Sequence, residues 1–300
     1  MKYDKIKGLE KKISKLILGN DNQTDYDEAS KLWDHWIEVG GNAFDNAHIY
    51  GGGTMEKLLG KWHKSRNNKD DLVIIAKGAH TPNCDPKSIS SQLTESLDRL
   101  ETDFADIYIM HRDNFEIPVG EFIDILNEEK NKGRIKIFGA SNWTLERFME
   151  ANHWAKIQDK QGFSILNNNL ALCKMINPLW DGCISSNDEA FLDYLEESQI
   201  AHLSWSSQGR GYFLPDMLTK KIEEDITASE TWRAPGEHSS GPLSCFDSED
   251  NRERKLRANS LAENLQTSAQ NIAGAWPLNL KFPSFALIGP RNIDEVNSSL

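Results

Sequence analysis

The repetition of one short pattern along the whole chain constrains the fold most: an apolar run, a polar turn, then an amphipathic helix. The apolar runs are continuous rather than alternating, which is typical of parallel strands buried on both faces. Strands are predicted at residues 14–18, 43–45, 72–77, 107–111, 135–140, 164–167, 201–205 and 285–288. Helices are predicted at residues 27–39, 55–65, 119–132, 145–156, 188–198 and 258–274, and around the apolar stripe Ile89, Leu93, Leu97 and Leu100.

Eight such units favour a closed (β/α)8 TIM barrel, which belongs to the α/β class, over an open sheet. A length of 300 residues fits one such barrel, so residues 1–300 are predicted to form a single domain. An open dinucleotide-binding sheet should carry G-x-G-x-x-G directly after its first strand, whereas this strand ends LGNDN. Residues from about 208 to 256 are predicted to be a long loop insertion, functional, mobile or both.

The charge and cysteine content limit the partners and the compartment. The net charge is −12 and no Lys/Arg-rich run appears, which argues against a nucleic acid or an anionic membrane as partner. No apolar stretch is long enough for a membrane helix, and the N-terminus is too charged for a signal peptide. The four cysteines form no CxxC pair. We therefore expect a cytoplasmic protein with reduced thiols, either a monomer or a small homo-oligomer.

Ionisable residues stand at the ends of three consecutive predicted strands. These are Asp45, Lys77 and His111, and Tyr50 lies in the loop that follows Asp45. Taken singly, such a lysine is more often a surface cation and such a histidine a satisfied core residue. In a barrel, however, the C-terminal strand ends meet at the catalytic face. The four residues are therefore predicted to surround one barrel mouth.

Together the four groups predict the reduction of a carbonyl group. The ordinary pKa of tyrosine is about 10, and a neighbouring ammonium such as that of Lys77 is expected to lower the pKa of Tyr50. A partly buried Lys77 needs a carboxylate partner, which Asp45 supplies. His111 could orient the carbonyl oxygen or share in its protonation. Hydride would then reach the carbonyl carbon while Tyr50 protonates the oxygen.

Other uses of these residues are less consistent with the sequence. Asp45, His48 and His111 could supply the three ligands of a zinc site, but Lys77 would repel a dication. A Schiff-base aldolase acting through Lys77 is disfavoured by the carboxylate of Asp45. The three glycines at 51–53 are not followed by Lys-Ser/Thr, so a phosphate-binding P-loop is not indicated. No metal site is predicted.

Longer motifs point to a family. The segment GGNAFDNAHIYGGGTMEKLLGKW resembles the aldo-keto reductase signature G-x-x-x-D-x-A-x-x-Y-G-x-x-x-x-E. AKG, IYIMHRD and GRIKIFGASNW resemble later motifs of that family in the same order, and WSSQGRG and FPSFALIGPRN resemble its nicotinamide-side and adenosine-side loops. The resemblance covers almost the whole chain. It implies an NADP-dependent oxidoreductase that acts on a small-molecule aldehyde or ketone, with Asp45, Tyr50, Lys77 and His111 as the catalytic tetrad.

The resemblance also implies a set of cofactor contacts, with NADPH expected and NADH as the alternative. The implied residues are Asp45, Ser141, Asn142, Asn167, Trp205, Ser206, Gln208, Arg210, Gly211, Gly289, Arg291 and Glu295. Ser141 and Asn142 match the pair that binds the nicotinamide carboxamide. Asn167 stands where the family usually has a glutamine, although any of the three asparagines at 167–169 could be the match. Trp205 matches an aromatic residue that stacks on the nicotinamide ring.

The adenosine-side segment departs from the family pattern. Arg291 offers the planar fork that suits a 2′-phosphate. Glu295 and Ser299 replace the usual Arg or Gln and the usual Asn, and Glu295 would repel a 2′-phosphate unless it points to the adenine. The chain also stops at Leu300, where many relatives continue into a loop, so an open substrate pocket is expected. A cofactor-binding regulatory subunit with vestigial catalysis is the alternative function.

Overall fold

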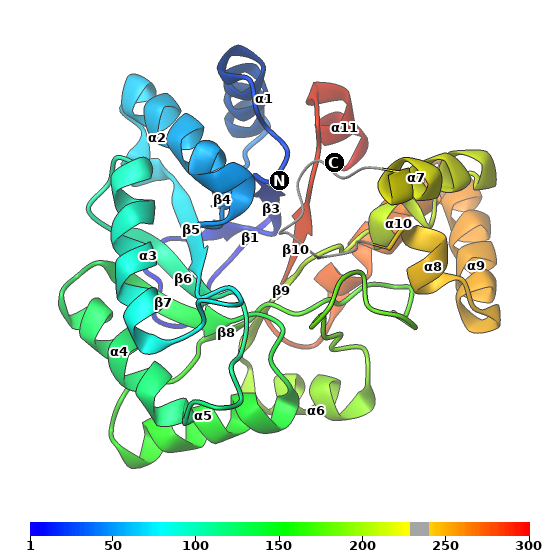
Figure 1. The fold of residues 1–300 in the computed structure, drawn as a ribbon. Coiled ribbons are helices and arrows are strands. Elements are labelled where there is room, and N and C mark those ends of the chain that lie inside the picture. The colour runs from blue at the N-terminus through cyan, green and yellow to red at the C-terminus, as the bar shows by residue number, and fades with distance from the viewer. Residues whose placement is uncertain (229–239) are drawn as a thin grey trace.

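The computed structural model describes residues 1–228 and 240–300 and contains a closed barrel of eight parallel strands (Figure 1). The strands are β3 (Leu16–Gly19), β4 (Ala43–Asp45), β5 (Val73–Gly78), β6 (Ala105–Met110), β7 (Ile135–Ala140), β8 (Ile165–Leu166), β9 (Ala201–Ser204) and β10 (Ser284–Ile288). They pair in chain order, and β10 pairs with both β9 and β3 to close the barrel. The predicted (β/α)8 TIM barrel is confirmed, and every predicted strand lies within two residues of the observed one.

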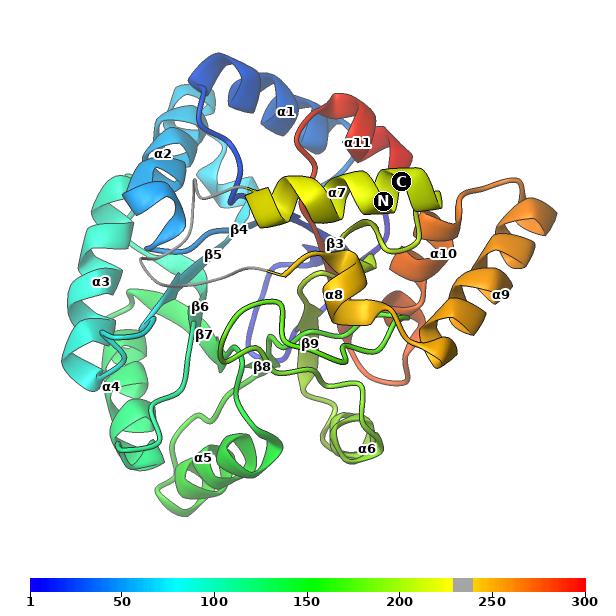
Figure 2. The ribbon, with the colours of Figure 1, turned by 45° about the vertical axis from the view of Figure 1, so that its right-hand side comes forward.

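Helices cover the outside of the barrel (Figure 1 and Figure 2). They are α1 (Tyr26–Glu38), α2 (Thr54–Arg66), α3 (Pro86–Arg99), α4 (Val119–Asn131), α5 (Leu145–Ile157), α6 (Glu189–Ser198), α9 (Glu249–Leu265), α10 (Ala269–Ala275) and α11 (Ile293–Ser298). Side chains that accept a hydrogen bond from the first turn fix where several helices begin, among them Asp25 for α1, Asp85 for α3 and Asp188 for α6. Each of these carboxylates pairs with backbone N–H groups that the first turn of a helix leaves without a partner.

Alternation along the strands divides the core into two layers. Small and branched residues such as Ile75 and Ile109 fill the barrel interior. Residues of the opposite parity, such as Phe44, face the helices and pack against Trp33 and Trp62. Because the strands are buried on both faces, they read in the sequence as unbroken apolar runs.

Two predictions about the C-terminal half need correction. The helix predicted at 258–274 is two helices, because Gln266 adopts φ 54° and ends α9, and Ser268 then caps α10. The predicted insertion at about 208–256 is not a plain loop. It contains a short 3-10 helix, η3 (Gly209–Gly211), two further helices, α7 (Asp216–Ala228) and α8 (Pro242–Phe246), and the start of α9. The remaining part of that prediction, residues 229–239, lies outside the described residues.

A small hairpin that was not predicted lies at the end of the barrel where β3 begins. Strands β1 (Tyr3–Asp4) and β2 (Ile13–Ser14) pair antiparallel, and Ile13 joins the interior core. Near the same end, Lys11 forms an ion pair of 2.9 Å with the buried Asp106. In the parts of the chain that are described, no helix has the length and apolarity needed to cross a bilayer.

Candidate active site

Three of the predicted catalytic side chains meet at the C-terminal ends of β4 and β5. Asp45 is the last residue of β4, and Lys77 is the penultimate residue of β5. The Lys77 Nζ atom lies 2.7 Å from Oδ2 of Asp45 and 2.8 Å from the Tyr50 hydroxyl. The ammonium group therefore bridges the carboxylate and the phenol.

His111 completes this group from the end of β6. Its ring lies 5.9 Å from the ring of Tyr50 in an edge-on arrangement, and the ring of His80 lies 4.9 Å away. Burial, and then the charges of Lys77, Arg112 and His80, hold the pKa of His111 well below its ordinary value. The imidazole of His111 is therefore neutral at physiological pH. It can donate a hydrogen bond, but it carries no positive charge.

Burial controls the protonation of the other members. It opposes the charged form of Lys77, yet the Asp45 carboxylate and Tyr50 together raise the pKa of Lys77 above its ordinary value. For Tyr50, burial outweighs the attraction of Lys77 and raises the pKa to about 12. The predicted lowering of the Tyr50 pKa is thus wrong, because burial destabilises the phenolate more than the one neighbouring ammonium stabilises it. Tyr50 keeps its proton over the physiological range.

The glycines after Tyr50 shape the turn that leads into α2. Gly51, Gly52 and Gly53 have φ values of 53°, 62° and 91°, which glycine adopts at least cost. A Cβ atom on Gly53 would lie only 2.5 Å from Cζ of Arg99. The glycines therefore allow the turn, and Gly53 also makes room for a guanidinium group.

Arg99 ties this turn to the helices outside the barrel. Its Nη1 atom lies 3.1 Å from the backbone oxygen of His48 and 3.1 Å from the buried carboxylate of Glu56. The His48 side chain turns to Glu95, with an Nε2–Oε2 distance of 2.8 Å, and does not join Asp45 and His111. No sequence motif had marked Arg99, because its partners His48 and Glu56 lie far away along the chain.

The predicted carboxamide-binding residues gather at the ends of β7 and β8. The Ser141 hydroxyl donates to the backbone oxygen of Asn167 at 2.6 Å, and Nδ2 of Asn142 donates to the Ser141 hydroxyl at 3.1 Å. Nδ2 of Asn167 donates to the backbone oxygen of Leu203 at 2.6 Å, while its Oδ1 is buried with no hydrogen-bond partner among the described residues. A buried acceptor of this kind calls for a donor from elsewhere.

The structure separates the three asparagines that the sequence left open. The Oδ1 and Nδ2 atoms of Asn168 are both hydrogen-bonded to the backbone of Trp143, so both polar atoms of this side chain have partners within the fold. Asn169 donates to the backbone oxygen of Trp205 at 3.1 Å. The Oδ1 atoms of Asn167 and Asn169 are both buried without a hydrogen-bond partner among the described residues, but of the three asparagines only Asn167 has its backbone oxygen bonded to the Ser141 hydroxyl. This arrangement favours Asn167 as the counterpart of the glutamine.

Trp205 follows β9 and takes part in a stack. Its ring lies 5.3 Å from that of Trp180 at an interplanar angle of 26°, and the Arg210 guanidinium lies 5.7 Å from the centre of the Trp180 ring. Trp180 was missed at the sequence level because it lies in an irregular connection without a motif. The backbone that follows Trp205 has positive φ at Ser206, Gly209, Arg210 and Gly211. Such left-handed residues turn backbone N–H groups towards a common side.

The adenosine-side segment follows β10 and leads into α11. Gly289 leaves open space, since a Cβ atom there would meet nothing nearer than Oδ1 of Asp21 at 4.0 Å. Glu295 accepts hydrogen bonds from Arg291, at 2.7 Å from its backbone nitrogen, 3.0 Å from Nε and 2.6 Å from Nη2. Glu295 is thus paired with Arg291. The sequence held a signal for this pair, because opposite charges four residues apart can meet on one face of a helix. Gln208 reaches the same region, with Nε2 at 3.5 Å from the Ser299 hydroxyl.

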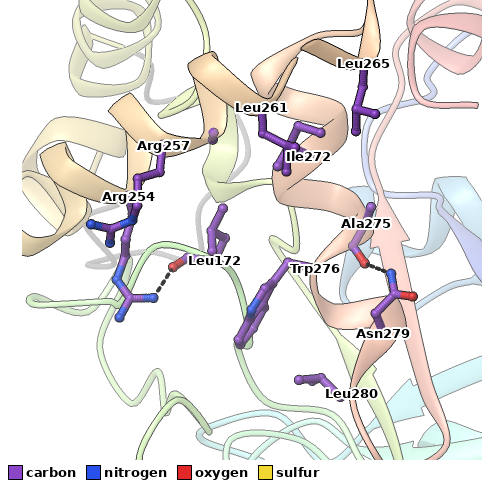
Figure 3. Close-up of a pocket in the computed structure, with 11 residues that line it drawn as sticks. Leu172, Arg254, Arg257, Leu261, Leu265, Ile272, Ala275, Trp276, Asn279 and Leu280 are labelled. Carbon is purple, nitrogen blue, oxygen red and sulfur yellow. Dashed lines mark hydrogen bonds between the residues drawn. The ribbon is translucent and has the colours of Figure 1, made fainter. Parts of the chain in front are cut away.

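A separate cavity of about 580 Å³ lies between α9 and α10 (Figure 3). Leu261, Ile272 and Trp276 give it an apolar lining, and Arg254 and Arg257 stand at its edge. Both arginines are already paired with acidic residues on the same helix. None of the predicted site residues lines this cavity, so it is not the catalytic mouth.

Comparison with known proteins gives one consistent result. The model of the aldo/keto reductase family matches residues 15–300. Norsolorinic acid reductase of Aspergillus flavus is 23% identical over 90% of this chain and 66% of that protein, and the uncharacterized oxidoreductase YrpG of Bacillus subtilis is 22% identical over 96% of this chain and 87% of that protein. The chain thus spans about two thirds of the length of the fungal relative. The crystal structure of a thermostable aldo-keto reductase, Tm1743, with the inhibitor epalrestat has the same fold, with a TM-score of 0.72, 21% identity and coverage of 100% of this chain and 93% of that chain.

Proposed function

The chain belongs to the aldo/keto reductase family, and we propose that it is an oxidoreductase that reduces an aldehyde or ketone to an alcohol with a nicotinamide dinucleotide. The observation that carries this proposal is the contact of 2.8 Å between Nζ of Lys77 and the Tyr50 hydroxyl, next to Asp45. A protonated phenol with a fixed ammonium behind it is suited to give up a proton to an oxygen that gains negative charge.

Each member of the tetrad has a distinct part in this proton transfer. Tyr50 would donate its hydroxyl proton to the carbonyl oxygen, and Lys77 would stabilise the phenolate that remains. Asp45 keeps Lys77 charged in a buried position. Neutral His111, edge-on to Tyr50, would donate an N–H to the same oxygen and so hold it in place. The reduced nicotinamide, when bound, supplies the hydride that reaches the carbonyl carbon.

The pKa of Tyr50 fits this role although it is raised. At a pKa of about 12 the phenol is protonated before substrate arrives, so no proton has to be loaded first. As the carbonyl is reduced, its oxygen becomes an alkoxide, which is a stronger base than a phenolate. The proton therefore moves downhill only when charge has developed on the substrate oxygen, which is the condition for catalysis at the transition state.

The residues at the mouth suit the nicotinamide end of such a cofactor. The unpartnered Oδ1 of Asn167 would accept from the carboxamide N–H, next to Ser141 and Asn142. One face of the Trp205 ring stacks on Trp180, and its other face would lie against the nicotinamide ring. The free Oδ1 of Asp45 is a second buried acceptor. The loop of Ser206, Gln208, Arg210 and Gly211, with its left-handed residues, would bind the pyrophosphate. Gly289, Arg291 and Glu295 would lie at the adenosine.

The experiment is a binding titration followed by kinetics. Addition of NADPH or NADH should quench tryptophan fluorescence through Trp205, and absence of binding by either at micromolar concentration would remove the proposal. Tyr50→Phe should then abolish carbonyl turnover while leaving cofactor affinity unchanged. Substrate screening should include norsolorinic acid, because norsolorinic acid reductase is among the similar proteins.

Multiple-turnover kinetics would separate an enzyme from a regulatory subunit. Repeated turnover supports the reductase, whereas a single turnover with retained cofactor would favour the subunit with vestigial catalysis. We further propose that residues 1–300 act as one domain in the cytoplasm, as a monomer or small homo-oligomer. The four cysteines, all of them free thiols, support that compartment.

A further inference from the structure

The arginine expected to bind a 2′-phosphate is already bound by a carboxylate. The Glu295 carboxylate accepts hydrogen bonds from Nε and Nη2 of Arg291 at 3.0 and 2.6 Å. These two donors form the edge that arginine offers to a phosphate. The same carboxylate also accepts the backbone N–H of Arg291 at 2.7 Å. Both donors on this edge of the Arg291 guanidinium are therefore already hydrogen-bonded to Glu295.

The surroundings of Arg291 are acidic as well. Asp225 of α7 lies close enough to add to Glu295 in raising the pKa of Arg291. Asp21 stands beside Gly289 on the other side of the segment. The guanidinium of Arg291 thus interacts with two carboxylates, Glu295 and Asp225, and Asp21 adds a third negative charge beside Gly289. A 2′-phosphate with its two negative charges would be repelled by these carboxylates. The residues present do not fit that phosphate.

A free ribose hydroxyl suits the same place. A carboxylate accepts a hydrogen bond from a 2′-hydroxyl, which is how dinucleotide sites of another fold recognise NAD, and an arginine there accommodates the 2′-phosphate of NADP. In this chain the carboxylate of Glu295 holds the arginine. The neutral 2′-hydroxyl is not repelled by the carboxylate of Glu295, and it can donate a hydrogen bond to that carboxylate.

We propose that Glu295 is a specificity residue that makes the site select NADH over NADPH. This inference rests on the proposed function and reverses the cofactor preference that the family resemblance alone implies. Glu295 acts in two ways: it engages the Arg291 fork, and it places a negative charge where the 2′-phosphate would lie.

The test compares the dissociation constants of NADH and NADPH by tryptophan fluorescence, without turnover. The wild-type protein should bind NADH about tenfold more tightly or better, because like charges brought together penalise the wrong ligand. Glu295→Gln keeps the shape and removes the charge. It should tighten NADPH binding by roughly tenfold and change NADH binding by less than about threefold.

Two further variants locate the effect. Asp294→Asn removes the same charge one residue away, from a side chain with no bond to Arg291 in the described part of the chain, and should leave both constants nearly unchanged. Arg291→Gln should alter NADPH binding little in the wild-type background but cancel the gain in the Glu295→Gln background. Thermal unfolding of each variant shows that it is folded.

The outcomes are distinct. Tighter binding of NADPH than NADH by the wild-type protein, unchanged in Glu295→Gln, overturns this inference and leaves the proposed reductase intact. An equal gain in Asp294→Asn and Glu295→Gln also overturns it, because general charge and not Glu295 would then decide. Failure of both cofactors to bind removes the proposed function and this inference with it.

Discussion

The ammonium of Lys77 and the carboxylate of Asp45 lie 2.7 Å apart, on neighbouring strands, with each side chain only 4% exposed. Loss of one partner leaves a buried charge uncompensated, so Lys77→Met should lower the free energy of unfolding by about 3–5 kcal/mol. It should also abolish carbonyl turnover.

The double variant Lys77→Met/Asp45→Asn separates the two effects. It should recover most of the lost stability in urea unfolding, because no charge is left alone, but none of the turnover. If the double variant unfolds as easily as the single one, charge burial is not the cause of the instability.

The raised pKa of Tyr50 leads to a prediction about pH. A proton donor fails once the pH rises through its pKa, and burial raises that of Tyr50 to about 12. The single-turnover rate of carbonyl reduction, measured with cofactor already bound, should therefore not fall through tyrosine ionisation between about pH 6 and 9. A loss of rate within this range that tracks ionisation of the Tyr50 phenol, followed by its ultraviolet absorbance, would contradict the burial argument.

The turn after Tyr50 can be tested with two matched glycines. Gly52 and Gly53 both have positive φ, so alanine at either position should cost about 1 kcal/mol of unfolding free energy through backbone strain. Gly53→Ala should cost roughly 2 kcal/mol more, because its Cβ would displace Arg99 from the buried Glu56. Only Gly53→Ala should also lower kcat. Equal effects of the two variants on stability and on kcat would show that Arg99 does not support the turn.

Acid should destabilise the fold through its buried histidines. Burial lowers the pKa of His202 to about 3, whereas the unfolded chain titrates near 6.5. Below about pH 6.5 the unfolded state takes up the proton first, so the stability present at neutral pH is lost as the pH falls, by up to about 1.4 kcal/mol per pH unit. In His202→Gln the free energy of unfolding in urea should fall less between about pH 7 and 5. An unchanged slope would exclude His202 as a source, while His111 acts in the same direction in both proteins.

The strand positions and the meeting of the four ionisable residues at one barrel mouth could be predicted because both depend on local signals. Buried parallel strands appear as continuous apolar runs, and the ends of those runs place Asp45, Lys77 and His111 at one mouth. The split between α9 and α10 could not be predicted in the same way. Gln266 is an ordinary helix former, and only its left-handed backbone reveals the end of α9.

Properties that depend on depth and on distant partners escaped the sequence. The sign of the Tyr50 pKa shift depends on how much protein surrounds the phenol, which residue types alone do not reveal. Trp180 stacks on Trp205 from a connection without a motif, and Arg99 reaches the carbonyl of His48 from a helix far along the chain. Glu295 is different, since its opposite charge four residues after Arg291 was visible, but the sequence could not show that its carboxylate is hydrogen-bonded to both Nε and Nη2 of Arg291.

The pairing of β10 with β3 has a consequence for how the barrel forms. Ala286 lies beside Leu16 although they are separated by most of the chain, so this pairing can form only after nearly the whole chain has been synthesised. Such pairing carries a large loop-closure entropy and slows folding. Until residues 284–288 arrive, β3 has an unpaired edge that other chains could extend. This chain should therefore be most prone to aggregate during the interval between synthesis of its first strand and addition of its last.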